Sequence, residues 1–544
     1  MYENKVYYQL KYDPREIQIE ALNFTKNNIN RGKKYILLNL TIGIGKSFYS
    51  VMYMNWYLNY VNDNARFDLL TNSKILQNQY VNEFPFINSL KGKNSYTCDT
   101  YNCSCQEGKE MNKALKRKCE DCPYDEAMNN WLKTKTALTN FHLFDTLHLF
   151  ATKIIENKDK NVLIIDEADG FESVLCGFIS MKISSRSLKL LGFSDHNIMR
   201  ISSEMNKIKN LHQYIDYIEN VFIPSLENLD SSIREKLSNH SIIQSEKIKL
   251  TKNLTNISSA NEVYNSFIND INASDENINN WTLDIEKDDN KQFPLSYSVQ
   301  PVWANKYLYD TIFKHYDHII FMSGTILDKD IFAYINGLNT DLCAYHSVSS
   351  PYDVKNRPIY YTKGIGKMTF ENKAETWEKQ KSLLDKIIKK NKDNKGIIHT
   401  TNYEISNWIQ EYYKDNDRFI FHKSDDRDEA LYKHMTSDKP TILVSPSMMS
   451  GVDLKDDLSR FQVIMKIPYP NISSNNIKKR QKQYPEWYNY KTCSDIIQMY
   501  GRSIRNENDW SHTFILDDSF STILKYNYKY LPDWFTEAIK ILKL

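Results

Sequence analysis

The chain has 544 residues, enough for roughly three or four domains. Hydrophobic residues make up 41% of it and charged residues 25%, which excludes a long disordered protein. Glycine is scarce, with 15 residues, which excludes collagen-like and glycine-rich low-complexity chains. The 70 basic and 68 acidic residues nearly cancel, so a nucleic-acid partner would need a local basic groove.

Hydropathy patterning argues against a membrane protein. No apolar stretch approaches the ~20 residues that a membrane-spanning helix needs. Residues 1–5, Met-Tyr-Glu-Asn-Lys, lack the apolar core of a signal peptide. We therefore expect a soluble protein of the cytoplasm that has no membrane partner.

Short apolar runs recur along the chain and predict strands that are buried on both faces. They are Tyr35–Leu40, Val162–Ile165, Ile319–Met322, Ile397–Thr400, Thr441–Val444, Val463–Ile467 and Thr513–Leu516. Helical stretches such as Ser47–Leu58 and Trp377–Lys390 separate many of them. This alternation predicts an α/β protein with parallel sheets. Pro351 and Pro358 flank a predicted linker between two α/β halves.

Two segments interrupt the alternation. Residues 91–124 hold five of the eight cysteines. Residues 178–296 are polar, rich in Asn and Ser, and mostly helical in periodicity, for example over Met205–Leu226 and Ser245–Asn256. We expect the second segment to be an inserted helical domain with little strand content.

A phosphate-binding loop is predicted where the first strand ends. Residues 40–47 read Leu-Thr-Ile-Gly-Ile-Gly-Lys-Ser between a predicted strand and a predicted helix, which is the context of a P-loop. Gly43 and Gly45 let backbone N–H groups approach a phosphate closely. Lys46 would neutralise the β- and γ-phosphates, and Ser47 would offer its hydroxyl to Mg²⁺. The motif departs from the usual pattern at its first position, which is Leu rather than Gly.

Two acids follow the apolar run at residues 162–165. Asp166 would hold Mg²⁺ through water, and Glu167 would be the base that orients the attacking water. An Asp-Glu pair after a strand is usually a solvated strand end. Its occurrence downstream of a P-loop favours an ATP site instead.

A third motif lies near the C-terminus. Gln498, Arg502 and Arg505 are spaced four and three apart, so they share one helix face. This face could present guanidinium groups to a γ-phosphate across a domain cleft, as an arginine finger does. The alternative is a basic surface helix.

These three motifs, in this order, resemble those of a superfamily 2 helicase of the XPD/DinG type. Further segments carry the resemblance: residues 14–18 resemble the Q motif, 139–143 the Asn-x-His-Leu segment, 321–326 motif III, 349–352 the Ser-Pro-Phe entry to the second motor domain, 445–454 motif V, and 467–470 the Leu-Pro-Phe-Pro after it. DEAD-box RNA helicases match less well, because residues 323–325 read Ser-Gly-Thr and the last motif begins with Gln498. One departure is Asp169, where the group usually has His.

The resemblance implies two RecA-like motor domains with two insertions. The first motor domain is expected at residues 1–90, 125–177 and 297–345, and the second at 346–544. An iron–sulfur insertion is expected at 91–124 and a helical, arch-like insertion at 178–296. The resemblance assigns ATP contacts to Gln18, Gly43, Ile44, Gly45, Lys46, Ser47 and Asp453, magnesium contacts to Ser47 and Asp166, and catalysis to Lys46, Asp166, Glu167, Gln498, Arg502 and Arg505.

The cysteine cluster predicts a metal site. Cys119 and Cys122 form the tight pair that suits a soft metal. We select Cys98 and Cys105 as the other ligands and take Cys103, two residues before Cys105, as spare. Spacing does not separate an iron–sulfur cluster from zinc held by the same four thiolates. The resemblance favours a 4Fe-4S cluster, with Cys103 in place of Cys105 as an open alternative.

The resemblance implies an ATP-dependent DNA helicase that moves on single-stranded DNA, 5′ to 3′, and acts on tailed or forked duplexes. Thr71 and Asn72 are candidate phosphate contacts. The alternatives are a nucleic-acid-stimulated ATPase that clamps or remodels complexes without unwinding, and an RNA helicase, which would depend on the 2′-OH. We expect a monomer that serves DNA repair or replication in a bacterial or phage-infected cytoplasm.

Overall fold

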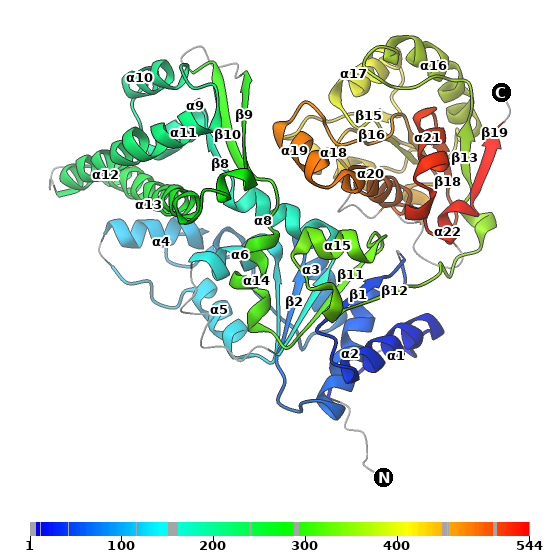
Figure 1. The fold of residues 1–544 in the computed structure, drawn as a ribbon, viewed down its shortest axis with the longest axis horizontal. Helices are drawn as coiled ribbons and strands as arrows, with labels where there is room; N and C mark the ends of the chain where they lie inside the picture. The colour runs from blue at the N-terminus through cyan, green and yellow to red at the C-terminus, as the bar shows by residue number, and fades with distance from the viewer. Residues whose placement is uncertain are drawn as a thin grey trace.

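The computed structural model describes residues 7–10, 12–41, 43–115, 117–150, 161–238, 242–287, 293–448, 454, 456–503 and 509–542. Two α/β lobes lie against each other in this part of the chain, and a mostly helical insertion stands beside the second lobe across a notch (Figure 1). Each lobe is built on a seven-stranded sheet in which every pairing is parallel. The expected α/β fold with two RecA-like sheets is confirmed.

The first sheet has the strand order β12-β1-β11-β7-β2-β6-β3. Its strands are β1 (Tyr35–Asn39), β2 (Phe67–Thr71), β3 (Asn88–Ser89), β6 (Thr136–Asn140), β7 (Val162–Asp166), β11 (His318–Ser323) and β12 (Cys343–Ser347). The register pairs Asn39 with Ser323 and Met322 with Asp166. Because parallel strands end at the same edge, the P-loop, Asp166 and Ser323 meet at the carboxyl edge of this sheet.

Helices cover both faces of the first sheet. They are α1 (Glu16–Asn30), α2 (Lys46–Tyr60), α3 (Lys74–Glu83), α5 (Pro123–Lys133), α6 (Phe141–Phe150), α8 (Phe171–Ile179), α14 (Asn305–Thr311) and α15 (Lys329–Asn336). Alternate residues of β1 enter different cores: Ile36 and Leu38 pack with α2, whereas Leu37 packs with residues of α8 and α14. A strand buried on both faces must be apolar throughout, which is the pattern the sequence shows.

The cysteine-rich segment forms a small insertion beside the first sheet. It contains the hairpin β4 (Thr97–Cys98) and β5 (Cys103–Ser104), followed by α4 (Cys105–Ala114). Ser104 caps α4 by accepting a hydrogen bond from the Glu107 N–H, and Glu107 bonds back to the Ser104 N–H. α4 packs against the long helix α13 of the second insertion.

The second insertion combines helices with a small sheet. Its elements are β8 (Met181–Ile183), α9 (Ser185–Leu191), α10 (Asp195–Met205), α11 (Leu211–Tyr217), α12 (Ile223–Ser238), α13 (Gln244–Ala273), β9 (Trp281–Lys287) and β10 (Leu295–Pro301). The antiparallel sheet β8-β10-β9 was not predicted. The helix expected over Met205–Leu226 is interrupted, because α10 ends at Met205 and α11 begins at Leu211.

The second lobe has the strand order β15-β16-β14-β17-β18-β13-β19. Its elements are β13 (Ile359–Thr362), α16 (Lys373–Lys390), β14 (Gly396–His399), α17 (Tyr403–Tyr412), β15 (Phe419–Ile420), α18 (Arg427–Thr436), β16 (Ile442–Ser445), β17 (Phe461–Ile464), α19 (Asn475–Gln483), α20 (Pro485–Tyr500), β18 (His512–Ile515), α21 (Ser519–Tyr526), α22 (Asp533–Thr536) and β19 (Ile539–Leu542). α19 is hydrogen-bonded to the insertion: Asn475 Nδ2 donates to the Leu283 carbonyl at 2.9 Å, and Asn476 Nδ2 to the Pro301 carbonyl at 2.8 Å. The second lobe therefore contacts both the first lobe and the insertion.

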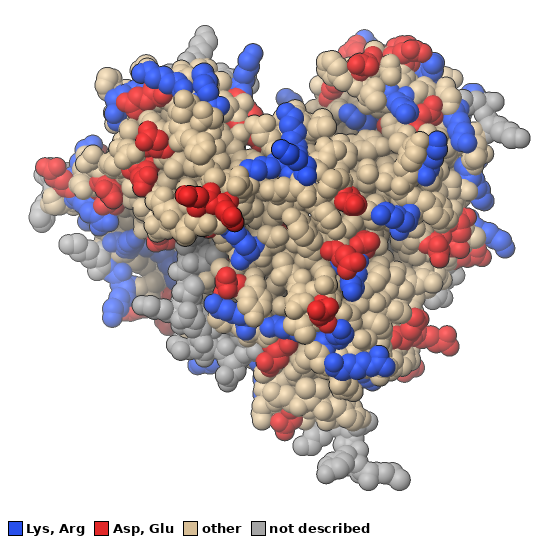
Figure 2. Space-filling model, in the orientation of Figure 1, with Lys and Arg blue, Asp and Glu red and all other residues tan. Residues whose placement is uncertain are grey.

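Charge is mixed over the visible face of the molecule. Figure 2 shows Lys and Arg gathered at the notch between the insertion and the second lobe, where α19 lies in Figure 1. α19 carries the exposed Lys478 and Lys482. In the described part of the chain, no helix is both long and apolar enough to cross a membrane.

Candidate active site

The P-loop lies between β1 and α2. Gly43 and Gly45 both have φ of +82°, a left-handed conformation that a residue with a side chain adopts only with strain. A Cβ on Gly45 would lie 2.8 Å from Gln18 Nε2, so a side chain there would also displace the Gln18 amide. The loop thus delivers Lys46 and Ser47 to the first turn of α2, where helix N–H groups and partial positive charge favour phosphate.

Lys46 is held by the two acids at the end of β7. Its Nζ lies 2.5 Å from Glu167 Oε1 and 3.3 Å from Asp166 Oδ1. Burial alone would lower the pKa of Lys46, but the charges of Glu167 and Asp166 outweigh it and raise that pKa. Burial raises the pKa of Asp166, although Lys46 opposes the shift. The predicted phosphate ligand and the predicted base are therefore paired with each other.

The two predicted magnesium ligands lie next to this pair. Ser47 and Asp166 offer a hydroxyl and a carboxylate, the hard oxygen donors that Mg²⁺ prefers. The carboxylates of Asp166 and Glu167 already surround one cation, the Lys46 ammonium. The donor set therefore fits Mg²⁺ bound together with nucleotide phosphates, which is how this ion is usually held.

Two residues that the sequence did not single out contact the magnesium ligands. Tyr80 Oη donates to Asp166 Oδ2 at 3.1 Å, and Ser47 Oγ donates to Glu83 Oε2 at 3.0 Å. Both lie on α3, three residues apart and so on one helix face. Tyr80 and Glu83 lie more than 30 positions after the P-loop in the sequence, so no local motif links them to it.

Gln498 connects the two lobes. Its Nε2 donates to Thr325 Oγ1 at 2.9 Å and to Asp169 Oδ2 at 3.1 Å, and Asp169 Oδ1 accepts from Ser323 Oγ at 2.5 Å. Burial, followed by the Glu167 charge, raises the pKa of Asp169. Asp169, which departs from the family pattern, therefore links its own motif II to motif III and to the last motif by accepting hydrogen bonds from both.

Arg502 lies beside Gln498, but the predicted shared helix face is wrong, because α20 ends at Tyr500 and Arg502 follows in a turn. Its Nη2 donates to Gln498 Oε1 at 2.6 Å and its Nε to the Gln498 carbonyl at 3.0 Å. Burial and the Arg502 charge lower the pKa of His399, at the end of β14, to about 3. Arg505, Asp453 and Ile42 lie outside the described residues.

Gln18 braces the P-loop. Its Nε2 donates to the Ile44 carbonyl at 2.7 Å and to the Gly45 carbonyl at 3.3 Å, while its Oε1 accepts from the Arg15 N–H at 2.9 Å. Both ends of the amide are thus engaged within the protein. The adenine contact assigned to Gln18 remains a prediction.

The candidate nucleic-acid contacts at the end of β2 differ from each other. Thr71 is fully buried, and its hydroxyl donates to the Ser73 carbonyl at 3.2 Å. Asn72 is half-buried. Of this pair, Asn72 has the more accessible side chain for a phosphate.

The structure gathers all five cysteines of the segment in one small core. Cys98, Cys105 and Cys122 are buried, and the Cys105 and Cys119 thiols both interact with Cys122. Cys103 is only half-buried and its Sγ contacts the neighbouring Ser104 carbonyl. Burial raises the pKa of the Cys105 and Cys119 thiols, so their thiolates would need a cation beside them.

Glycine makes room for one of these sulfurs. A Cβ on Gly108 would lie 2.5 Å from Cys98 Sγ, so α4 can pass this thiol only where it has no side chain. Among the described residues, no three His, Cys, Asp or Glu groups are already arranged around one metal position. The soft thiol donors and the space kept for Cys98 fit a metal–sulfur group.

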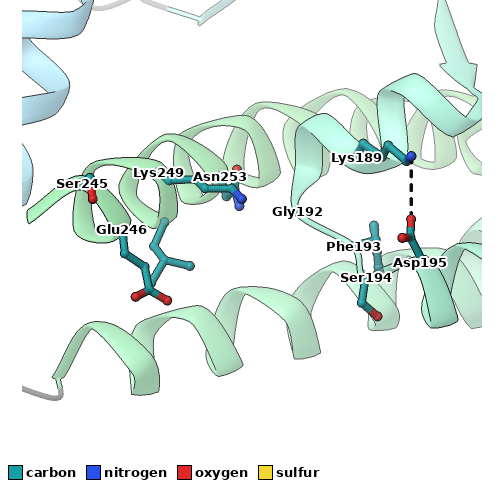
Figure 3. A pocket seen from close by; sticks show the side chains of 10 residues that line it. Lys189, Gly192, Phe193, Ser194, Asp195, Ser245, Glu246, Lys249 and Asn253 are labelled. Carbon is teal, nitrogen blue, oxygen red and sulfur yellow. Dashed lines mark ion pairs between the residues drawn. The ribbon is translucent and has the colours of Figure 1, made fainter. Parts of the chain in front are cut away.

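A pocket of about 770 Å³ lies in the helical insertion, away from the P-loop (Figure 3). Lys189 and Asp195, whose charged groups are 3.7 Å apart, line one side, and Glu246, Lys249 and Asn253 of α13 line the other. None of the predicted site residues lines it.

Comparisons with known proteins agree with this arrangement. A helicase C-terminal domain model matches residues 384–538, and a model of the type III restriction enzyme res subunit matches residues 11–173. A solved XPD helicase aligns over 98% of this chain and 100% of its own, with a TM-score of 0.67 at 16% identity. Xpd4 of S. tokodaii aligns over 97% of this chain and 100% of its own, with a TM-score of 0.57 at 16% identity.

Curated relatives match shorter stretches. The ATP-dependent DNA helicase CHL1 of Candida albicans is 31% identical over 134 residues, which are 21% of this chain and 16% of that protein. CHL1 of Saccharomyces cerevisiae is 24% identical over 170 residues, 25% of this chain and 19% of that protein. The chain thus spans less than a fifth of the length of these relatives. The chain therefore shares the fold of solved XPD helicases, and it is similar to the two family models over residues 11–173 and 384–538 and to CHL1 helicases over shorter stretches.

Proposed function

We propose that the chain is an ATP-dependent DNA helicase that moves along single-stranded DNA. The observation that carries this is the Gln498 contact with Asp169 and Thr325, which joins the second lobe to the sheet edge that holds the P-loop. A nucleotide bound at Lys46 would lie beside this contact. Its binding and hydrolysis would then change how the two lobes meet, which is the movement a translocating motor needs.

The Lys46–Glu167 pair suggests how hydrolysis is restrained before ATP binds. While Lys46 occupies the Glu167 carboxylate, that carboxylate is poorly placed to orient a water molecule. Phosphate oxygens would attract Lys46 and release Glu167 for the attacking water. Ser47 and Asp166 would hold Mg²⁺, which when bound neutralises charge that develops on the phosphates. Arg502 and Arg505 are proposed as the guanidinium donors from the second lobe.

The four cysteines Cys98, Cys105, Cys119 and Cys122 are proposed to hold a 4Fe-4S cluster. The cluster would stabilise an insertion whose own core is small. α4 of this insertion packs on α13, so both insertions would line one path for a single strand. α19 lies at the notch beside the second insertion (Figure 1), and its exposed lysines Lys478 and Lys482 would supply part of the local positive charge.

ATP hydrolysis with and without nucleic acid tests this proposal. We expect single-stranded DNA to stimulate hydrolysis by the wild-type protein, and Glu167→Gln to abolish it while nucleotide still binds. Stimulation by RNA but not by DNA would move the assignment to an RNA helicase. An absence of ATP hydrolysis in the wild-type protein with either nucleic acid would contradict the motor assignment.

A further inference from the structure

α3 reaches both proposed magnesium ligands from one side. Tyr80 Oη lies 3.1 Å from Asp166 Oδ2, and Glu83 Oε2 lies 3.0 Å from Ser47 Oγ. The two ligands come from different elements, β7 and α2, so a third element that contacts both can fix their separation. We propose that Tyr80 and Glu83 are positioning residues for the magnesium site, an inference that rests on the proposed ATP site.

Tyr80 fixes the orientation of the Asp166 carboxylate. Oδ1 of Asp166 accepts from the Glu167 N–H at 2.9 Å and faces Lys46 Nζ at 3.3 Å, while Oδ2 accepts from Tyr80. Both oxygens are therefore directed by donors, and the carboxylate cannot rotate without losing one of them. Tyr80 is itself 2% exposed and packs in the core around α2, so its ring cannot move aside.

Glu83 fixes the orientation of the Ser47 hydroxyl. A hydroxyl has one hydrogen and two lone pairs, and a metal ion must face a lone pair. Because the Ser47 hydrogen is directed at Glu83, the lone pairs are left for the ion. α3 therefore supplies both partners: Glu83 accepts the hydrogen bond from Ser47, and Tyr80 donates one to Asp166.

The place of Glu83 in α3 supports a functional reason for its charge. Glu83 is the last residue of the helix, where the partial negative charge of the helix end disfavours a carboxylate. A cation bound beside Ser47 would offset this cost. Outer partners of metal ligands typically contribute 10–100-fold to metal affinity or activity.

Binding of Mn²⁺ in the presence of ADP, followed by electron paramagnetic resonance, tests the inference without turnover. We expect Tyr80→Phe and Glu83→Leu to weaken Mn²⁺ binding by about 10–100-fold while metal-free ADP affinity changes little. Glu83→Gln keeps an acceptor for the Ser47 hydroxyl and should recover most of the loss. Tyr53→Phe is the matched control, because Tyr53 is fully buried in the same core and no described residue bonds its hydroxyl.

Steady-state ATP hydrolysis provides the second readout. The variants should need more Mg²⁺ for half-maximal rate, yet approach the wild-type kcat at saturating Mg²⁺. Wild-type Mn²⁺ affinity in both Tyr80→Phe and Glu83→Leu would overturn the inference and leave the ATP site intact. Failure of the wild-type protein to bind Mn²⁺ and ADP together would overturn the ATP site, and the inference with it.

Discussion

A buried ion pair between the two lobes offers the sharpest test of how they are held together. Arg480 of α19 donates to both oxygens of Glu172 of α8, at 2.9 and 3.2 Å. The two side chains are only 9% and 4% exposed. The Arg480 guanidinium also lies 4.5 Å from the ring of Trp303 and 5.3 Å from that of Trp487. Glu172→Gln would therefore leave a cation in an aromatic cage without its counter-charge.

The expected cost follows from this geometry. Removing one partner of a buried ion pair costs about 3–5 kcal/mol, because the remaining charge stays desolvated. In the wild-type protein the Ala304 N–H donates to Glu172 Oε1 at 3.0 Å, and the glutamine oxygen can still accept this bond. We therefore expect a cost near the lower end of this range. At about 1.4 kcal/mol per tenfold change, 3 kcal/mol corresponds to a roughly 150-fold rise in the population of separated lobes.

Urea unfolding followed by tryptophan fluorescence measures this change. Trp303 and Trp487 contact each other edge to face at 5.6 Å, so their surroundings and their emission change when the two lobes separate. Glu172→Gln should add an early transition, and Glu172→Gln with Arg480→Met should partly reverse it, since no buried charge then remains. As a control, Glu375→Gln removes an exposed pair with Lys379 and should cost less than about 0.5 kcal/mol. A Glu172→Gln protein that unfolds like the wild type would refute the reasoning.

The remaining predictions concern the two proposed sites and the second lobe. Lys46→Ala should reduce ATP hydrolysis by at least about 100-fold with an unchanged circular dichroism spectrum; normal turnover would remove the P-loop assignment. Cys122→Ser should lose bound metal and lower the melting temperature after anaerobic purification, whereas Cys103→Ser should keep both; full metal content in the first variant contradicts the ligand choice. His399 has a pKa of about 3 against an ordinary 6.5, so its stabilising effect is complete above pH 6.5 and is lost as pH falls, by about 2 kcal/mol at pH 5. His399→Gln should flatten that pH dependence in urea unfolding, and parallel curves for the two proteins would count against a buried neutral imidazole.

The core strands could be predicted because burial on both faces gives short, wholly apolar runs. All seven predicted strands occur, and β1 and β7 begin at the predicted residues. The sheet β8-β10-β9 escaped prediction because its edge strand β9 is buried only at its start, so its last residues are polar. The broken helix before Leu211 lacked a proline or glycine to mark the break.

The candidate site, too, could be predicted from the sequence only where a local motif carries its residues. Lys46, Asp166 and Glu167 could be predicted because local motifs carry them. Tyr80 and Glu83 could not, since their proposed role depends on how the fold packs α3 against β2 and β6 and so brings it beside Ser47 and Asp166. The choice of Cys98, Cys105, Cys119 and Cys122 as ligands stays a prediction, and no local pattern predicted the space that Gly108 leaves for Cys98.

The interlobe contact of Asp169 shows what a departure from a family pattern can mean. In the sequence, Asp169 stands where the XPD/DinG group usually has His. In the structure, its carboxylate accepts hydrogen bonds from both Ser323 and Gln498. An acidic side chain at this position can therefore connect motif II with motif III and with the last motif. Gln498 Nε2 is the donor in the bond to Asp169, and it also donates to Thr325.

Strand displacement tests the central claim most directly. The anaerobically purified protein would be given ATP, Mg²⁺ and matched duplexes that carry either a 5′ or a 3′ single-stranded DNA tail, with Lys46→Ala as the control. We predict unwinding of the 5′-tailed duplex alone, by the wild-type protein alone. If neither duplex is unwound while DNA still stimulates ATP hydrolysis in the same tube, the chain is a clamp or remodelling ATPase and the helicase account is wrong.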